Sequence, residues 1–122
     1  MPVENGLYYS ISSNGEATDP TLILIHGAGG THLGWHSTIR RMPGMKVLAV
    51  DLPGHGRSDG SGRHSITDYA HDILDFLFAL KLPRVVLAGH SMGGAIAIQA
   101  VLEAPERFLG LIPVCSGAVC NI

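Results

Sequence analysis

Mostly apolar runs alternate with longer amphipathic stretches along this chain. Three short runs have the length and the Val, Ile and Leu content of strands that are buried on both faces of a sheet: 21–25, 46–50 and 84–88. Three longer stretches are predicted to be helices from apolar spacing or from an Ala, Ile and Leu content without internal breakers: 31–42, 66–80 and 92–103. Strand and helix therefore alternate at short intervals through most of the sequence.

The two ends of the pattern add further strands. Residues 2–12 are typical of a β-hairpin, with Asn5–Gly6 as the turn and alternating residues after it, and residues 12–20 are expected to be a polar loop. The last run, 108–114, is apolar on both faces, as an interior strand would be. We expect one α/β domain over residues 1–122, with an N-terminal β-hairpin and a mainly parallel sheet that carries helices on both faces.

Glycine-rich loops follow three of the predicted strands, at 26–30, 51–59 and 89–94. The carboxyl ends of parallel strands lie at one edge of a sheet, and ligands bind beyond that edge. The three loops should therefore meet at a common site. Within the second loop, Asp51 and Arg57 are candidates for a salt bridge that holds the loop together.

Composition excludes several classes of protein. A formal charge of −2 and a pI near 6.3 give no reason to expect nucleic acid as a partner. No apolar run is long enough to span a membrane, and the N-terminus does not resemble a signal peptide, so we expect a cytoplasmic protein. Cys115 and Cys120 are expected to be reduced thiols, with Cys115 packed in the interior.

The third glycine-rich loop contains the pattern Gly89–x–Ser91–x–Gly93 between a predicted strand and a predicted helix. A serine at so sharp a turn takes a strained backbone conformation and projects its hydroxyl away from the sheet. Strand and helix can cross closely only where the residues two before and two after the serine are nearly bare, a requirement that both glycines meet. The alternative is a glycine-rich turn with an incidental serine.

Other kinds of site lack their sequence signals. No Gly-x-Gly-x-x-Gly opens a helix, and no Gly-Lys-Ser/Thr marks a phosphate-binding loop. His32 and His36 are four residues apart, but no third metal ligand accompanies them, so surface histidines are expected. We expect neither a metal nor a cofactor.

Three motifs together resemble the N-terminal half of the α/β-hydrolase fold family, of the esterase and lipase kind. They are 24–30 with Trp35, 51–59, and 89–94 with 104–107. The resemblance implies that Ser91 is the nucleophile and that the backbone N–H groups of Ala28 and Met92 form an oxyanion hole. Six further motif residues would shape that site: His26, Gly27, Gly29, Gly89, His90 and Gly93. Trp35 is expected in the core or in a pocket wall.

The resemblance implies a serine hydrolase that acts on small carboxylic ester or related acyl substrates through an acyl-enzyme. A serine, rather than an aspartate, argues against the dehalogenase and epoxide-hydrolase branches. In this family the acid and the histidine base follow the nucleophile, but no histidine follows Ser91, and Glu103 and Glu106 lie in the wrong place for the acid. The base and the acid must then come from elsewhere.

Three histidines near the expected site are poor substitutes for the base. His26 and His55 belong to loop motifs in which a histidine packs and hydrogen-bonds locally, and the ring of His90 should point away from Ser91 on so sharp a turn. The chain is therefore expected to be a truncated core that lacks the cap and the C-terminal strands. The edge of strand 108–114 would pair with a complementary C-terminal fragment or with a second copy.

Two alternatives remain open. The chain could be a non-catalytic fragment that binds a ligand or a partner at the same cleft. It could also be an acyltransferase or a carbon–carbon hydrolase, since the same turn serves those reactions.

Overall fold

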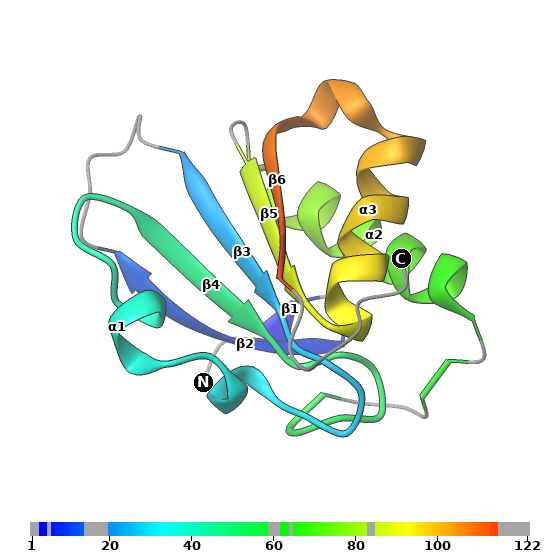
Figure 1. Cartoon of the computed structure of the whole chain (residues 1–122), viewed down its shortest axis with the longest axis horizontal. Coiled ribbons are helices and arrows are strands. Elements are labelled where there is room, and N and C mark those ends of the chain that lie inside the picture. The colour runs from blue at the N-terminus through cyan, green and yellow to red at the C-terminus, as the bar shows by residue number, and fades with distance from the viewer. Residues whose placement is uncertain are drawn as a thin grey trace.

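The computed structural model describes residues 3–4, 6–13, 20–58, 62–63, 65–82 and 85–114. These residues form one sheet with the strand order β1-β2-β4-β3-β5-β6 (Figure 1). The strands are β1 (Val3–Glu4), β2 (Leu7–Ser13), β3 (Thr21–Ile25), β4 (Lys46–Val50), β5 (Val85–His90) and β6 (Phe108–Val114). Strands β4, β3, β5 and β6 run parallel, and β2 joins the sheet antiparallel to β4.

The N-terminal hairpin is confirmed, and its second strand runs one residue further than predicted. Strands β1 and β2 pair antiparallel around a turn in which Gly6 has a φ of 78°. Such a φ lies in the left-handed region, which glycine adopts without steric cost. The predicted parallel strands are confirmed as well, with Ile23 of β3 opposite Leu48 of β4 and Leu87 of β5.

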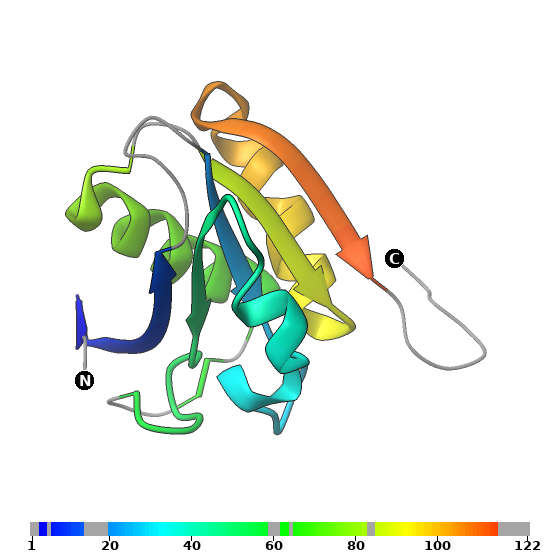
Figure 2. The same cartoon turned by 90° about the vertical axis from the view of Figure 1, so that its left-hand side faces the viewer.

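Helices cover both faces of the sheet. On one face lie α2 (Ile66–Leu80) and α3 (Met92–Glu103), and on the other lie a short 3₁₀ turn, η1 (His32–Gly34), and α1 (Ser37–Arg40) (Figures 1 and 2). Because successive side chains of a strand point to opposite faces, the residues of each strand divide between two cores. Ile23 packs with α2 and α3, whereas Leu24 packs with Trp35 on the opposite face.

Helix α2 has the ends that its sequence predicts. The hydroxyl of Ser65 accepts a hydrogen bond of 3.1 Å from the N–H of Asp68, as expected of a cap at the start of a helix. At the other end, Lys81 takes a left-handed conformation with φ 55° and ψ 43°. This helix carries Ile73 and Phe76, which are fully buried against the sheet.

The predicted single helix over 31–42 is wrong, because the chain is extended at Trp35, with φ −89° and ψ 134°. Trp35 is 8% exposed and packs in the smaller core, while the backbone N–H of His32 donates to Asp51, 19 residues away. These tertiary contacts outweigh helix propensity and leave η1 and α1 as separate turns. Thr31 caps the first turn, and His36 caps the second through Nδ1.

Strand β6 forms the edge of the sheet within the residues that the structure describes. It pairs with β5, and Leu109 and Ile112 are 54% and 49% exposed. The expected pairing of its outer edge stays a prediction. Cys115 and Cys120 lie outside the described residues, as does the last residue of the 51–59 loop.

A short 3₁₀ turn, η2 (Pro105–Arg107), connects α3 to β6. No helix in the described part of the chain is both long and apolar enough to cross a membrane.

Candidate active site

Ser91 stands between β5 and α3 in a strained backbone conformation, with φ 57° and ψ −117°. Among non-glycine residues that the structure describes, only Lys81 also has a positive φ. The side chain of Ser91 makes no capping hydrogen bond to α3, although serine at this position normally does. The residue is exposed, so its hydroxyl is accessible at the start of the helix.

Close packing of β5, α3 and β3 explains the two glycines that flank Ser91. A Cβ atom on Gly89 would overlap the carbonyl of Gly93 and lie 2.6 Å from the nitrogen of Gly94. A Cβ atom on Gly93 would overlap the carbonyl of Ile25. Since real side chains do not approach backbone so closely, only glycine allows this crossing, as the sequence predicted.

The loop after β3 passes directly beside Ser91. A Cβ atom on Gly27 would lie 3.3 Å from the carbonyl oxygen of His90 and 3.4 Å from Cβ of Ser91. The N–H of Gly30 donates to the carbonyl of Gly27, and Gly29 has a φ of 73°, which together turn the loop back tightly. Ala28 lies exposed at the tip of this turn.

Helix α3 begins at Met92, next to that loop. The first N–H groups of a helix have no partner within it, and the positive end of the helix dipole lies at the same place. The two residues predicted to supply oxyanion donors, Ala28 and Met92, thus flank the same cleft, since both line a small pocket described below.

His26 anchors the first loop to the second. Its ring is 2% exposed, its Nδ1 lies 2.6 Å from the carbonyl oxygen of Gly27, and its Nε2 accepts a 3.0 Å hydrogen bond from the N–H of Leu52. A proton on Nδ1 satisfies both contacts. Burial disfavours the charged ring and lowers the pKa of His26 below its ordinary value.

His55 makes a second bridge between the same loops. Its Nε2 accepts a hydrogen bond of 3.1 Å from the N–H of Gly29, and its Nδ1 lies 3.1 Å from the carbonyl oxygen of Pro53. Both ring nitrogens are again committed to the backbone. The expectation that His26 and His55 pack and bond locally is confirmed for one ring nitrogen of each, whereas the other nitrogen bonds to the opposite loop, 26 residues away.

Asp51 is fully buried and organises the second loop. Its carboxylate accepts hydrogen bonds from the backbone N–H groups of His32 and Arg57, and its backbone carbonyl accepts one from the hydroxyl of Ser58. Burial alone would raise the pKa of Asp51, but the two N–H donors and the His32 ring outweigh it and lower that pKa.

Two expectations about these loops are wrong. Arg57 meets Asp51 through its backbone rather than through a side-chain salt bridge, because its guanidinium lies 5.5 Å from the centre of the Tyr8 ring. His32 is not a surface histidine: its side chain is 12% exposed, and its Nδ1 lies 2.9 Å from Asp51. His36 is exposed, as predicted.

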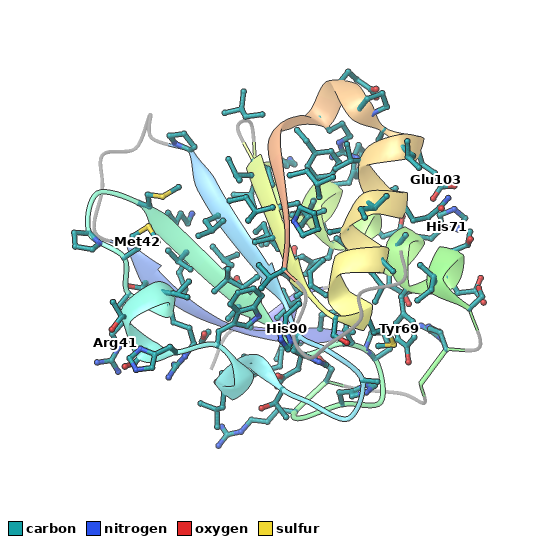
Figure 3. The ribbon with its side chains drawn as sticks, viewed as in Figure 1. Arg41, Met42, Tyr69, His71, His90 and Glu103 are labelled. Carbon is teal, nitrogen blue, oxygen red and sulfur yellow. The ribbon has the colours of Figure 1, made fainter. Side chains whose placement is uncertain are left out.

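Ser91, His90 and Trp35 line an open pocket of about 360 Å³, together with the loop after β3. The rings of Trp35 and His90 meet edge to face, with centres 6.2 Å apart (Figure 3 labels His90). Trp35 belongs both to the core and to this wall. Its buried Nε1 has no hydrogen-bond partner among the described residues.

A smaller pocket, of about 220 Å³, lies against Ala28 and Met92 on the side of α2. Its wall includes Tyr69, which the apolar spacing of the predicted helix 66–80 does not single out as a site residue. The one available signal was a hydroxyl-bearing residue among apolar residues on the inner face of α2. Over the described residues, no cluster of three or more potential metal ligands occurs.

The fold agrees with the comparisons. The model of the α/β hydrolase fold family matches residues 20–121, and the chain belongs to that family. It is 41% identical over 111 residues to the pimeloyl-[acyl-carrier protein] methyl ester esterase of Pectobacterium carotovorum. The matched region covers 90% of this chain and 41% of that protein.

Two further matches are another relative and a solved structure. A putative 2-succinyl-6-hydroxy-2,4-cyclohexadiene-1-carboxylate synthase of Bacillus subtilis is 29% identical over 115 residues, covering 92% of this chain and 42% of that protein. The solved structure of a marine microorganism esterase superposes with a TM-score of 0.78 at 30% identity, covering 88% of this chain and 40% of that one. The chain thus spans about two fifths of the length of these relatives, two of which are named as esterases and one as a putative synthase.

Proposed function

We propose that Ser91 is the nucleophile of a serine hydrolase that cleaves small carboxylic esters or related acyl compounds through an acyl-enzyme. The observation that carries this proposal is the backbone of Ser91, whose φ of 57° and ψ of −117° hold an accessible, uncapped hydroxyl at the start of α3. Strain of this kind persists only where the surrounding structure imposes it, and it is concentrated at functional sites. Esterase-named relatives support the same reaction class.

The chemistry follows from the groups around Ser91. Its Oγ attacks the carbonyl carbon of the ester, and the carbonyl electron pair moves onto oxygen. The N–H groups of Met92 and Ala28 stabilise that oxyanion, each by about 3 kcal/mol in a preorganised site. When the carbonyl re-forms, the alcohol leaves with a proton and the acyl group stays on Ser91, from which water later releases it.

A base must take the proton of Ser91, and the nearby histidines do not suit that task. Both nitrogens of His26 and of His55 are bound to the backbone. His90 packs edge to face against Trp35. We therefore place the base and its orienting acid outside these 122 residues, in keeping with the serine, acid, histidine order of this fold.

The proposal is tested with an activated ester on the chain alone. An oxyanion hole without a base still accelerates acyl transfer, by about 10³- to 10⁴-fold over water in well-studied serine hydrolases. We therefore expect p-nitrophenyl acetate to release one equivalent of nitrophenol slowly, with acetyl retained on Ser91 because deacylation lacks a base. Ser91→Ala should abolish the retained acetyl group and the one-equivalent release that accompanies it, and Ser37→Ala, on the exposed turn α1, should leave both unchanged.

The same assay separates the alternatives. Release that is unaffected by Ser91→Ala would refute the nucleophile, and binding of the ester without any release would favour a non-catalytic binding fragment. If acylated Ser91 transfers its acyl group faster to an added alcohol than to water, the site is an acyltransferase. Attack on a ketone substrate with carbon–carbon cleavage would identify the remaining alternative.

A further inference from the structure

Tyr69, which lines the small pocket beside Met92, carries a buried hydroxyl that the proposed reaction does not use. Tyr69, on α2, is 6% exposed, and its Oη accepts a hydrogen bond of 2.9 Å from the backbone N–H of Arg63. Among the residues that the structure describes, no acceptor is found for the proton of this hydroxyl. Figure 3 shows Tyr69 near the first turn of α3, in agreement with its place in the same pocket wall as Met92.

The charge in the pocket wall is already compensated. Arg63 contributes to the wall, but its Nε and Nη2 lie 2.7 Å and 3.3 Å from the carboxylate oxygens of Asp72. Ile66 and Met92 add apolar surface. A short, mainly apolar group with one uncharged oxygen fits this wall better than a carboxylate, because the nearby cation already has its counter-ion.

The pocket is placed to receive part of the substrate. Ala28 lines both pockets, so an ester carbonyl held by the N–H groups of Ala28 and Met92 has the larger pocket on one side and the smaller pocket on the other. The smaller one measures about 220 Å³, against about 360 Å³ for the larger one. That volume admits a short chain.

We propose that Tyr69 is a specificity-determining residue that donates a hydrogen bond to an uncharged ether or carbonyl oxygen in the substrate group bound by the smaller pocket. This inference rests on the proposed function, because the ester site positions the substrate. It predicts a preference for short oxygen-substituted acyl esters over purely aliphatic ones of the same length.

The test compares two nearly isosteric esters, methyl methoxyacetate and methyl butanoate, which differ by one oxygen in place of a methylene. Binding of each to the 122-residue protein is followed by NMR of backbone amides, with Ile66 reporting on the smaller pocket and the single indole N–H, of Trp35, on the larger one. We expect methoxyacetate to bind roughly 2- to 12-fold more tightly, the range for one hydrogen bond. The chemical-shift changes that methyl methoxyacetate causes should be largest at the backbone amide of Ile66.

Tyr69→Phe should remove that preference, whereas Tyr9→Phe, the same chemical change on β2, should leave it intact. Equal dissociation constants for the two esters in the wild-type protein, shifts confined to Trp35, or no binding of either ester would each overturn the inference. Binding is measured without hydrolysis and is repeated in Ser91→Ala. A preference that persists in both proteins while the wild-type protein releases no nitrophenol would refute the proposed catalysis alone, and release from the wild-type protein without any preference would refute the inference alone.

Discussion

Replacing Ser91 with glycine should stabilise the protein relative to Ser91→Ala. The backbone of Ser91, at φ 57° and ψ −117°, lies outside the left-handed helical region that non-glycine residues sometimes adopt. Alanine keeps the Cβ atom and therefore the strain, whereas glycine removes both. The comparison of the two variants isolates the backbone, because both lack the hydroxyl.

The expected size follows from two opposing terms. A sparsely populated backbone conformation costs about 1–3 kcal/mol, which glycine avoids. Glycine also destabilises the protein by about 0.4–1 kcal/mol, because its unfolded chain has greater conformational freedom. The net gain is about 1 kcal/mol, which raises the melting temperature by roughly 3–5 °C in a chain of this length.

Urea unfolding followed by circular dichroism measures this difference. Lys81→Gly, at the other positive φ, should also stabilise, and Ser10→Gly in the extended strand β2 should be less stable than Ser10→Ala. If Ser91→Gly unfolds at a lower urea concentration than Ser91→Ala, the backbone of Ser91 is not strained and the central observation fails.

Three other predictions concern packing and charge. Gly93→Ala should lose at least about 3 kcal/mol or fail to fold, because its Cβ meets the backbone of β3, while Gly34→Ala, with open space around it, should unfold at nearly the wild-type urea concentration. Asp51→Asn should cost about 2–4 kcal/mol in urea unfolding at pH 7. Because the folded pKa of Asp51 is lowered, the advantage of wild type is present above about pH 3.8 and should shrink as pH falls through the folded pKa; a constant difference would contradict this. The side-chain hydrogen bond and the charge of Glu103 raise the pKa of His71 above 6.5. The stability that this pair contributes is therefore complete below pH 6.5 and is lost as pH rises through the folded pKa of His71. An NMR titration should show a lower pKa for His71 in Glu103→Gln, and an unchanged value would refute the pairing (Figure 3).

Much of the fold could be predicted because its signals are local. Apolar runs identified β3 and β5, and the glycines around Ser91 predicted the tight crossing of β5 and α3 that the structure contains. The same pattern predicted which loops would meet, since strand direction decides at which edge each loop emerges.

The remaining features depend on contacts between distant residues. The helix expected over 31–42 breaks because His32 binds Asp51 and Trp35 enters the core. Neither contact can be predicted from the spacing of apolar residues within this segment. The expected salt bridge of Arg57 failed for a similar reason, since a carboxylate can be satisfied by backbone N–H groups as well as by a guanidinium. Apolar spacing predicted the helix over 66–80, but such spacing carries no information on which buried residue of the helix borders a pocket, as Tyr69 does.

The most direct test of the central claim is the reaction of the intact chain with a fluorophosphonate probe, read by intact mass and then by peptide mapping. The claim is that the turn between β5 and α3 presents Ser91 to a carbonyl or phosphoryl centre beside the N–H groups of Ala28 and Met92. We predict a single adduct on Ser91, absent from Ser91→Ala and from urea-unfolded protein. Labelling of other serines at the same rate, or no adduct on folded protein, would contradict the account.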